Sequence, residues 1–286
     1  MNNLKYIIDQ IDELPPLPDI AFKLVKLTAS LDTDISEIIQ LVEQDQAITI
    51  KVLKMCNSSF YGFSQRVSSV QQAVVLLGYN TLYKIVLTVA TSDFFKQGAA
   101  GYGLTTQDLW RHSVATAIAS ETLAQKFDRQ KAQTAYVSGL IHDIGKVLIS
   151  SYIQEDIKKI LDLTQTGKTF IEAENEVLGM DHAMIAGKLV RKWKFPEPLV
   201  EAVKYHHEPQ LAVSDKELCA FTHLGNAVAG TIGIGIGIDS FKNSVSDHVL
   251  KTYPLDEAEL EEIVLITQQR VVEAEEFIKQ AMVSAV

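Results

Sequence analysis

Apolar residues recur at three- and four-residue spacing along nearly the whole chain, and this periodicity restricts the fold more than any other feature. Within residues 34–59, for example, Ile35, Ile38, Ile39 and Val42 fall on one helical face. Alternating runs rich in Val, Ile and Thr, which would indicate strands, are scarce. The chain is therefore predicted to be all-α, as a two-lobed helical bundle.

Start and stop signals divide this pattern into separate helices. A serine-capped helix is predicted to break at Gly78, and Asn80 or Thr81 is predicted to cap the next helix. Residues 131–153 are predicted to form one continuous helix. Two further helices are expected on either side of Gly179.

Composition and charge exclude several classes of partner. The formal net charge is −10, which argues against nucleic-acid binding because such binding needs a basic face. Cys56 and Cys219 are far apart in sequence and are predicted to be buried free thiols, which fits a reducing compartment. The chain begins without a signal-peptide pattern, and no apolar run approaches the roughly 20 residues that a membrane helix needs. We expect a soluble, cytoplasmic protein that binds neither nucleic acid nor membrane.

The stretch GLIHDIGKVLI, residues 139–149, places a histidine and a carboxylate side by side in an otherwise apolar run. Burying His142 and Asp143 is costly unless they are paired or bound to a metal. Facing helices of a bundle can aim further imidazoles at the same interior point. Imidazole with carboxylate suits Fe, Mn, Zn or Ni, in a mononuclear or dinuclear site that Asp143 could bridge. The candidate metal ligands are His112, His142, Asp143, His182, His206 and His207.

Further motifs extend this pattern along roughly residues 10 to 212. They are Leu14–Pro18, Gln44–Ala47, Leu53–Tyr61, Ala73–Gly78, Trp110–Ser113, Gly139–Gly145 and Tyr205–Pro209. In this order the series resembles the HDOD family, the HD-related output domains, within the HD superfamily of metal-dependent phosphohydrolases. The resemblance implies an all-helical bacterial regulator whose second lobe is similar to the HD superfamily. It also implies a family in which many members lack metal ligands and catalysis is not established.

The ligand set is similar to that of the HD-GYP cyclic-di-GMP phosphodiesterases, and it includes a lysine, Lys146, just after the His–Asp pair. Two departures count against that activity. No Gly-Tyr-Pro motif follows Glu208, and the last aspartate of the family aligns with Asn226. Asp108, one helical turn before His112, is an additional candidate ligand.

With the resemblance in place, the chain is predicted to have four parts. They are an N-terminal helical lobe (1–97), a linker (98–104), an HD-like helical lobe (105–230) and a glycine-rich turn with a C-terminal helical extension (231–286). The run GTIGIGIGID lacks the Lys-Ser/Thr ending of a P-loop, so an irregular turn with close backbone packing is favoured over a phosphate loop. The tail helix is expected to pack on its own domain, with homodimerisation as the alternative.

Three functions remain open. The favoured one is a bacterial signalling module without catalytic activity, which binds metal and contacts a signalling protein partner, with Asn57–Gly62 as a candidate surface. The second is a metal-dependent phosphohydrolase for a cyclic dinucleotide or nucleotide, with Asp143 and Lys146 as catalytic residues. The third is a purely structural fold in which the histidines only bond backbone groups.

Overall fold

The computed structural model describes residues 19–28, 35–57, 63, 65–96, 98–239 and 245–283. These residues form α-helices, short 3-10 helices and one isolated bridge between Ala99 and Leu104, with no strand among them, so the all-α prediction is confirmed. Within the same ranges no helix combines the length and the apolar composition needed to cross a membrane. The α-helices are α2 (Asp19–Thr28), α3 (Ile35–Gln44), α4 (Gln46–Cys56), α5 (Val70–Leu77), α6 (Tyr79–Thr91), α7 (Thr106–Phe127), α8 (Ala132–Ile141), α9 (Ile144–Gln165), α10 (Phe170–Leu178), α11 (His182–Lys192), α12 (Glu197–Lys204), α13 (Lys216–Thr231), α14 (Asp247–Thr252) and α15 (Glu257–Val283).

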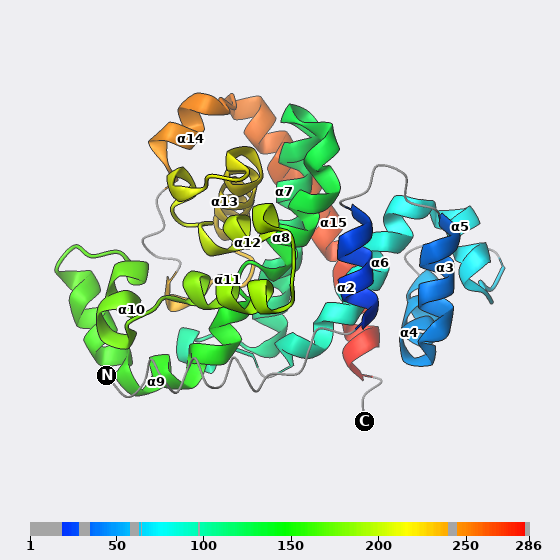
Figure 1. Cartoon of the computed structure of the whole chain (residues 1–286), viewed down its shortest axis with the longest axis horizontal. Helices are drawn as coiled ribbons and strands as arrows, with labels where there is room; N and C mark the ends of the chain where they lie inside the picture. The colour runs from blue at the N-terminus through cyan, green and yellow to red at the C-terminus, as the bar shows by residue number, and fades with distance from the viewer. Residues whose placement is uncertain are drawn as a thin grey trace. The chain divides into compact units, whose positions relative to one another are not determined.

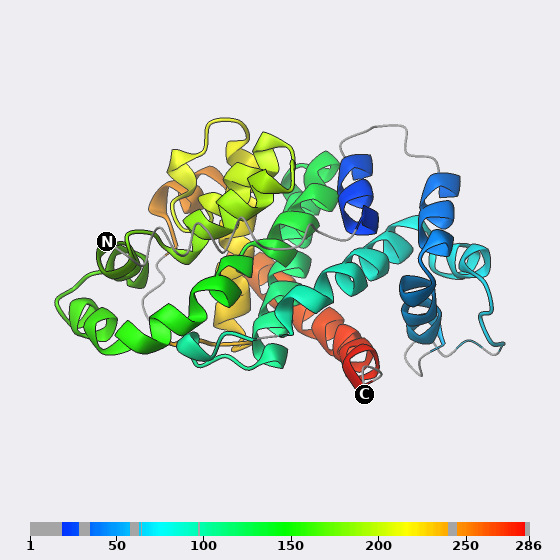
Figure 2. The same cartoon turned by 60° about the horizontal axis from the view of Figure 1, so that its bottom comes forward.

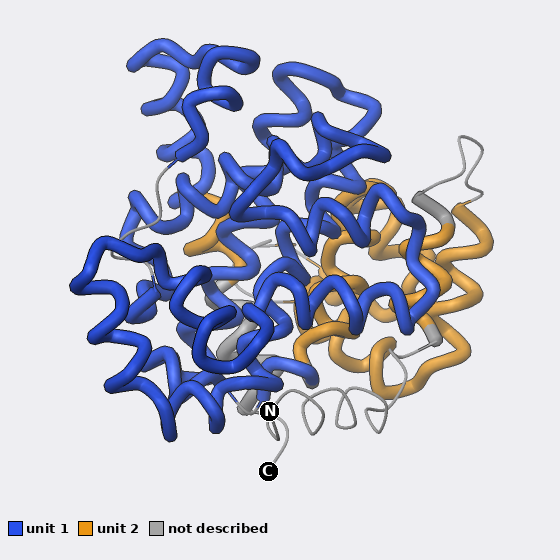
Figure 3. Tube along the Cα trace, turned by 60° about the vertical axis from the view of Figure 1, so that its left-hand side comes forward, with its two compact units in different colours: residues 1–15, 94–268 blue, residues 16–93, 269–286 orange. Residues whose placement is uncertain are grey.

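The chain divides into two compact units (Figure 3). One contains residues 94–268, and the other contains the described residues of 16–93 together with 269–283. The four-part domain division expected from the sequence stays a prediction. Cys56 in the second of these units and Cys219 in the first are buried free thiols, as predicted.

In the unit built from 16–93, α2, α4 and α5 pack against α6. Tyr83 and its helical neighbours fill the core of this unit. Gly78 ends α5 with φ +77°, as predicted, because glycine accepts this left-handed backbone without strain. The next helix then begins immediately at Tyr79, with Gly78 itself as the N-cap. The expectation of a cap at Asn80 or Thr81 was therefore wrong, since both residues lie inside the first turn of α6.

In the unit built from 94–268, α8 and α13 both pack against the long helix α7, while α9 and α10 extend to one side (Figures 1 and 2). Small residues allow the close approach. A Cβ at Gly139 of α8 would lie 2.7 Å from the Cα of Ala117, and one at Gly225 of α13 would lie 2.1 Å from the Ser120 hydroxyl. Ile263 of α15 joins the core around α7 and α13, which confirms that this part of the tail packs on its own unit.

The continuous helix expected over 131–153 is interrupted at the histidine–aspartate pair, so that prediction was wrong. Helix α8 ends at Ile141 and α9 begins at Ile144, and Asp143 has φ −97° and ψ 9°. A continuous helix would point two consecutive side chains about 100° apart. The interruption instead lets His142 and Asp143 both lie fully buried. By contrast, the predicted break at Gly179 is confirmed, because Gly179 caps α10 in the left-handed conformation and α11 starts at His182.

Candidate metal centre

Two groups of three side chains converge in the unit built from 94–268. The first triad is His112, His142 and Asp143, and the second triad is His182, His206 and His207. Within each triad the candidate ligand atoms lie within 4.8 Å of one another. All six ligands predicted from the sequence thus fall into these two triads.

Five secondary-structure elements deliver these side chains. His112 lies on α7, and His142 with Asp143 occupies the interruption between α8 and α9. His182 is the first residue of α11, and the remaining two histidines follow the end of α12. Helices α9 and α11 meet closely because Gly145 has no side chain: a Cβ there would lie 2.0 Å from the His182 carbonyl oxygen.

The carboxylate of Asp143 joins the two triads. Its Oδ2 lies 3.3 Å from His142 Nε2 and 3.6 Å from His112 Nε2, both in the first triad. Its Oδ1 lies 3.4 Å from His182 Nε2 and 3.7 Å from His206 Nε2, both in the second triad. Each oxygen of this one side chain therefore faces a different triad, which is the arrangement of a bridging ligand.

The other nitrogen of each of these four rings is held by an oxygen acceptor. A carbonyl or carboxylate oxygen can only accept, so Nδ1 of each ring donates a proton to it. Nε2 of each ring faces Asp143, and Nε2 of His112 also lies 2.9 Å from Asn226 Oδ1. Such an outer partner fixes the tautomer and orientation of metal-ligating histidines. The Nδ1 acceptors are Ile234 O for His112 (3.0 Å), Gly139 O for His142 (2.7 Å), Glu174 Oε2 for His182 (2.9 Å) and Val203 O for His206 (2.7 Å).

Three atoms at the middle of this cluster have no hydrogen-bond partner: His142 Nε2, His206 Nε2 and Asp143 Oδ1. Leaving a buried polar atom unpaired costs about 1–3 kcal/mol. The hypothesis that the histidines only bond backbone accounts for their Nδ1 atoms but not for these Nε2 atoms. One cation shared by the two triads, or one bound at each, would satisfy them, because two ligands with bonds of about 2.1 Å to one ion lie about 3.0–3.4 Å apart. The residues therefore fit a divalent transition metal.

Burial sets the protonation of most of the rings. It lowers the pKa of His112 and holds the pKa values of His206 and His207 well below their ordinary value, which keeps these imidazoles neutral. Burial also opposes the charged form of His182, but the Glu174 and Asp143 carboxylates outweigh it and raise the pKa of His182 to about 10. A metal at the second triad would therefore displace a proton from His182.

A buried lysine places a positive charge beside two carboxylates at this centre. Lys146 Nζ lies 2.5 Å from Asp143 Oδ2 and 2.7 Å from Asp239 Oδ2. Burial opposes its charge, but the two carboxylates outweigh burial and raise the pKa of Lys146 above its ordinary value. Burial likewise opposes ionisation of Asp143, yet the nearby His142 ring and the Lys146 ammonium hold the pKa of Asp143 well below its ordinary value. Asp143 is thus a carboxylate, the form that binds metal.

Sequence reasoning missed two acidic residues at this centre. Glu174 bonds both the ring and the backbone N–H of His182, and its Oε1 accepts a 2.6 Å hydrogen bond from the Tyr102 hydroxyl. A signal existed, because Phe170, Glu174 and Leu178 recur every four residues and so place an acid on an apolar helix face. Asp239 follows the glycine-rich run, where no periodicity could have placed it.

Of two other candidate residues, Asn226 and Asp108, only the first lies at the centre. Asn226 does reach the centre, because its Oδ1 lies 2.9 Å from His112 Nε2. Asp108 does not join either triad. It serves instead in the capping box of α7, where its Oδ2 accepts hydrogen bonds from the backbone N–H and hydroxyl of Thr105. The predicted partner surface Asn57–Gly62 lies outside the described residues, apart from Asn57.

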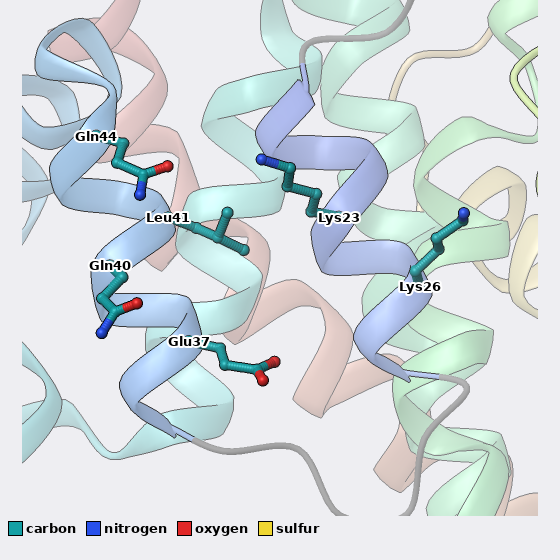
Figure 4. Close-up of a pocket in the computed structure, with 6 residues that line it drawn as sticks. All are labelled: Lys23, Lys26, Glu37, Gln40, Leu41 and Gln44. Atoms are coloured by element: carbon teal, nitrogen blue, oxygen red, sulfur yellow. The ribbon is translucent and has the colours of Figure 1, made fainter.

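A separate pocket of about 360 Å³ lies between α2 and α3 in the unit built from 16–93 (Figure 4). Five of its six lining side chains are exposed amides or charged groups, and only Leu41 is partly buried. No histidine or cysteine lines it, so it offers no transition-metal chemistry. Its lining residues are Lys23, Lys26, Glu37, Gln40, Leu41 and Gln44.

With this geometry, the comparison with known proteins decides the family. The HDOD domain model matches residues 14–209. The chain belongs to the HDOD family. Among curated relatives, an uncharacterized protein of Treponema pallidum is 26% identical over 210 residues, which cover 70% of this chain. The chain spans only 39% of that relative's length.

Solved structures share the HDOD fold. A candidate signal transduction protein of Marinobacter aquaeolei is 23% identical with a TM-score of 0.74, over 96% of this chain and 60% of that one. A candidate phosphohydrolase of Shewanella amazonensis is 21% identical with a TM-score of 0.68, over 96% of this chain and 97% of that one. At these identities the likeness shows the fold alone.

Proposed function

We propose that this HDOD chain is a regulatory, metal-binding signalling module without hydrolytic activity. One observation carries the metal: His142 Nε2 and His206 Nε2 are buried without a hydrogen-bond partner, and they lie 3.3 Å from Asp143 Oδ2 and 3.7 Å from Asp143 Oδ1, respectively. A bound cation, or a pair bridged by Asp143, would satisfy these buried polar atoms. The bound ion would order the surroundings of Asp143, and a protein partner would respond to that order.

The donor set selects the kind of metal. Five imidazoles and one carboxylate favour Fe, Mn, Zn or Ni over an all-oxygen calcium site. Because the two oxygens of Asp143 face different triads, the centre accommodates one ion or a pair bridged by Asp143. The ligand residues are those of the two triads.

Burial and charge favour regulation over catalysis. His142, Asp143, His182 and His206 are fully shielded from solvent, so a substrate would have to displace protein to reach them. The ammonium of Lys146 is already paired with two carboxylates. Asn226 stands where a further carboxylate would strengthen metal binding, and an amide supplies no charge.

Metal content is the direct test. The protein would be purified without chelator or nickel resin, and metal per chain would be measured by inductively coupled plasma mass spectrometry. We expect at least one equivalent in the wild type and a near-complete loss in Asp143→Ala, because both triads lose their shared carboxylate. Asp247→Ala, at an exposed aspartate of α14, is the matched control and should keep the metal. Wild-type protein that stays metal-free after incubation with Zn²⁺, Mn²⁺ or anaerobic Fe²⁺ would refute the proposal.

A metal-dependent phosphohydrolase is the second candidate, and the position of Lys146 beside Asp143 favours it. A bound metal would supply a water of lowered pKa as the nucleophile. Lys146 would neutralise charge on the phosphoryl oxygens, and Asp143 would orient the ligands of both triads. Turnover of bis-p-nitrophenyl phosphate or of a cyclic dinucleotide by metal-loaded protein, abolished in Lys146→Met, would establish it over the regulatory function.

A further inference from the structure

Residues 232–239, here called the strap, contact the candidate metal centre at two points. Near its start, the carbonyl oxygen of Ile234 accepts the hydrogen bond from His112 Nδ1 at 3.0 Å. At its end, Asp239 pairs with Lys146 at 2.7 Å. One short segment therefore touches a ligand of the first triad and the lysine that pairs with the central carboxylate.

Glycines make this approach feasible. Gly235 has φ +60°, and a Cβ there would lie 2.2 Å from the Asp108 carbonyl oxygen and 2.7 Å from His112 Cβ. At Gly237 a Cβ would lie 2.4 Å from Asp239 Oδ1. A larger residue at either position would lift the strap from α7 or move the Asp239 carboxylate. The glycine-rich run is thus shaped for contact with the centre, which agrees with the expected close backbone packing.

A buried ion pair between Asp239 and Lys146 holds the end of the strap. Asp239 is only 3% exposed, and its Oδ1 has no hydrogen-bond partner, so its contact with Lys146 carries the attachment. Lys146 in turn contacts Asp143. Lys146 therefore links the end of the strap to the bridging carboxylate, in addition to the contact that Ile234 makes through His112.

We propose that the strap is a closing element that controls exchange between the metal centre and solvent, with the Asp239–Lys146 ion pair as its latch. The inference rests on the proposed function, because it describes the regulation of the same centre. With the strap closed, the rim of the first triad is covered at His112. Opening exposes His112 and breaks the Asp239–Lys146 ion pair, so a metal ion can enter or leave.

The test measures how fast zinc leaves. Zinc-loaded protein would be mixed with excess EDTA, and zinc release would be followed until its rate no longer depends on the EDTA concentration. We expect Gly235→Ala and Asp239→Asn each to release zinc at least tenfold faster than the wild type. Two matched controls should keep the wild-type rate. They are Gly230→Ala, where a Cβ meets nothing within 4 Å, and the exposed-site variant Asp247→Asn.

A wild-type release rate in both strap variants would overturn the inference. If the wild type binds no zinc, the proposed function fails, and the strap is tested in the metal-free chain instead. There, the rate at which diethyl pyrocarbonate modifies His112 would be read by peptide mass spectrometry. Faster modification in both strap variants, but in neither control, supports the closing element. Equal rates in all five proteins would reject it.

Discussion

The two triads of the candidate metal centre both contain imidazoles but differ in charge and in exposure. The first triad contains the carboxylate of Asp143, and its three side chains are buried. The second triad consists of imidazoles only, and His207 is partly exposed. The first triad is covered by the strap through Ile234, whereas the second is supported from outside by Glu174.

This difference predicts which of the two triads binds a divalent metal more tightly. A carboxylate contributes negative charge to a site for a divalent cation, and an imidazole contributes none. The second triad must share the Oδ1 atom of Asp143, which lies 3.4 Å from His182 Nε2. In the metal-free protein His182 also holds a proton that a metal must displace. We therefore expect the first triad to bind metal more tightly than the second.

Removing one histidine at a time, first from one triad and then from the other, should give the largest changes in metal affinity. We expect His112→Ala to weaken the tighter site by more than about 100-fold, because a lost ligand costs more than a lost outer partner. His206→Ala should leave that site nearly unchanged and remove the weaker one. Zinc titrations against a chelating dye, together with metal per chain, measure both. Equal losses in the two variants would mean that one ion is shared by all the ligands.

Glu174→Gln should have the next largest effect on metal affinity. The amide can still accept a hydrogen bond from His182 Nδ1 but no longer supplies charge, so second-triad affinity should fall by about 10- to 100-fold. First-triad affinity should not change. Glu176→Gln, an exposed change on the same helix, is the control. A loss confined to the first triad would show that the two triads have been ranked or assigned wrongly.

Asn226→Asp should instead widen the difference in zinc affinity between the two triads. It places a carboxylate beside His112 Nε2, where the amide oxygen now lies at 2.9 Å. We expect first-triad affinity for zinc to rise by about tenfold, since an added anionic ligand strengthens the attraction. The same titration measures it. An unchanged affinity would place residue 226 outside the ligand sphere, and phosphodiesterase activity in this variant would favour the hydrolase alternative.

Thr169→Ala should have the smallest effect. Thr169 and Glu172 form the capping box that starts α10, the helix that carries Glu174. Loss of the cap should reduce the free energy of unfolding by about 1 kcal/mol. Hydrogen bonds from Thr169 lower the pKa of Glu172, so this contribution is present above the ordinary glutamate pKa and fades as pH falls through the lowered value. Urea unfolding at pH 7 and at pH 3 would show a smaller difference between variant and wild type at pH 3.

Local signals along the chain predicted much of the fold. Gly179 ends α10 because it accepts the left-handed conformation, whatever packs around it. The periodic apolar residues predicted helices throughout, and the order of His112, His142, Asp143 and the later histidines pointed to the side chains that form the two triads. Such signals depend on neighbours within one or two helical turns, so they can be read directly from the sequence.

Features that depend on distant contacts could not be predicted in this way. The interruption at His142 and Asp143 lies within a good helical pattern, and it accompanies the packing of Gly145 against the start of α11. Asp239 reaches Lys146 only because the strap folds back onto α7 across more than ninety intervening residues. Glu174 gave a weak signal as an acid on an apolar face, but its partner His182 was not identifiable without the turn between α10 and α11.

The sequence by itself determined that this chain is helical, that it belongs with the HDOD proteins and which six side chains could bind a metal. Only the tertiary structure decided that these ligands form two triads around one carboxylate, with their Nε2 atoms inward and a strap across them. The physical reason is that ligand identity is a property of each residue, whereas unpaired acceptors and buried ion pairs arise only when separate helices bring those residues together.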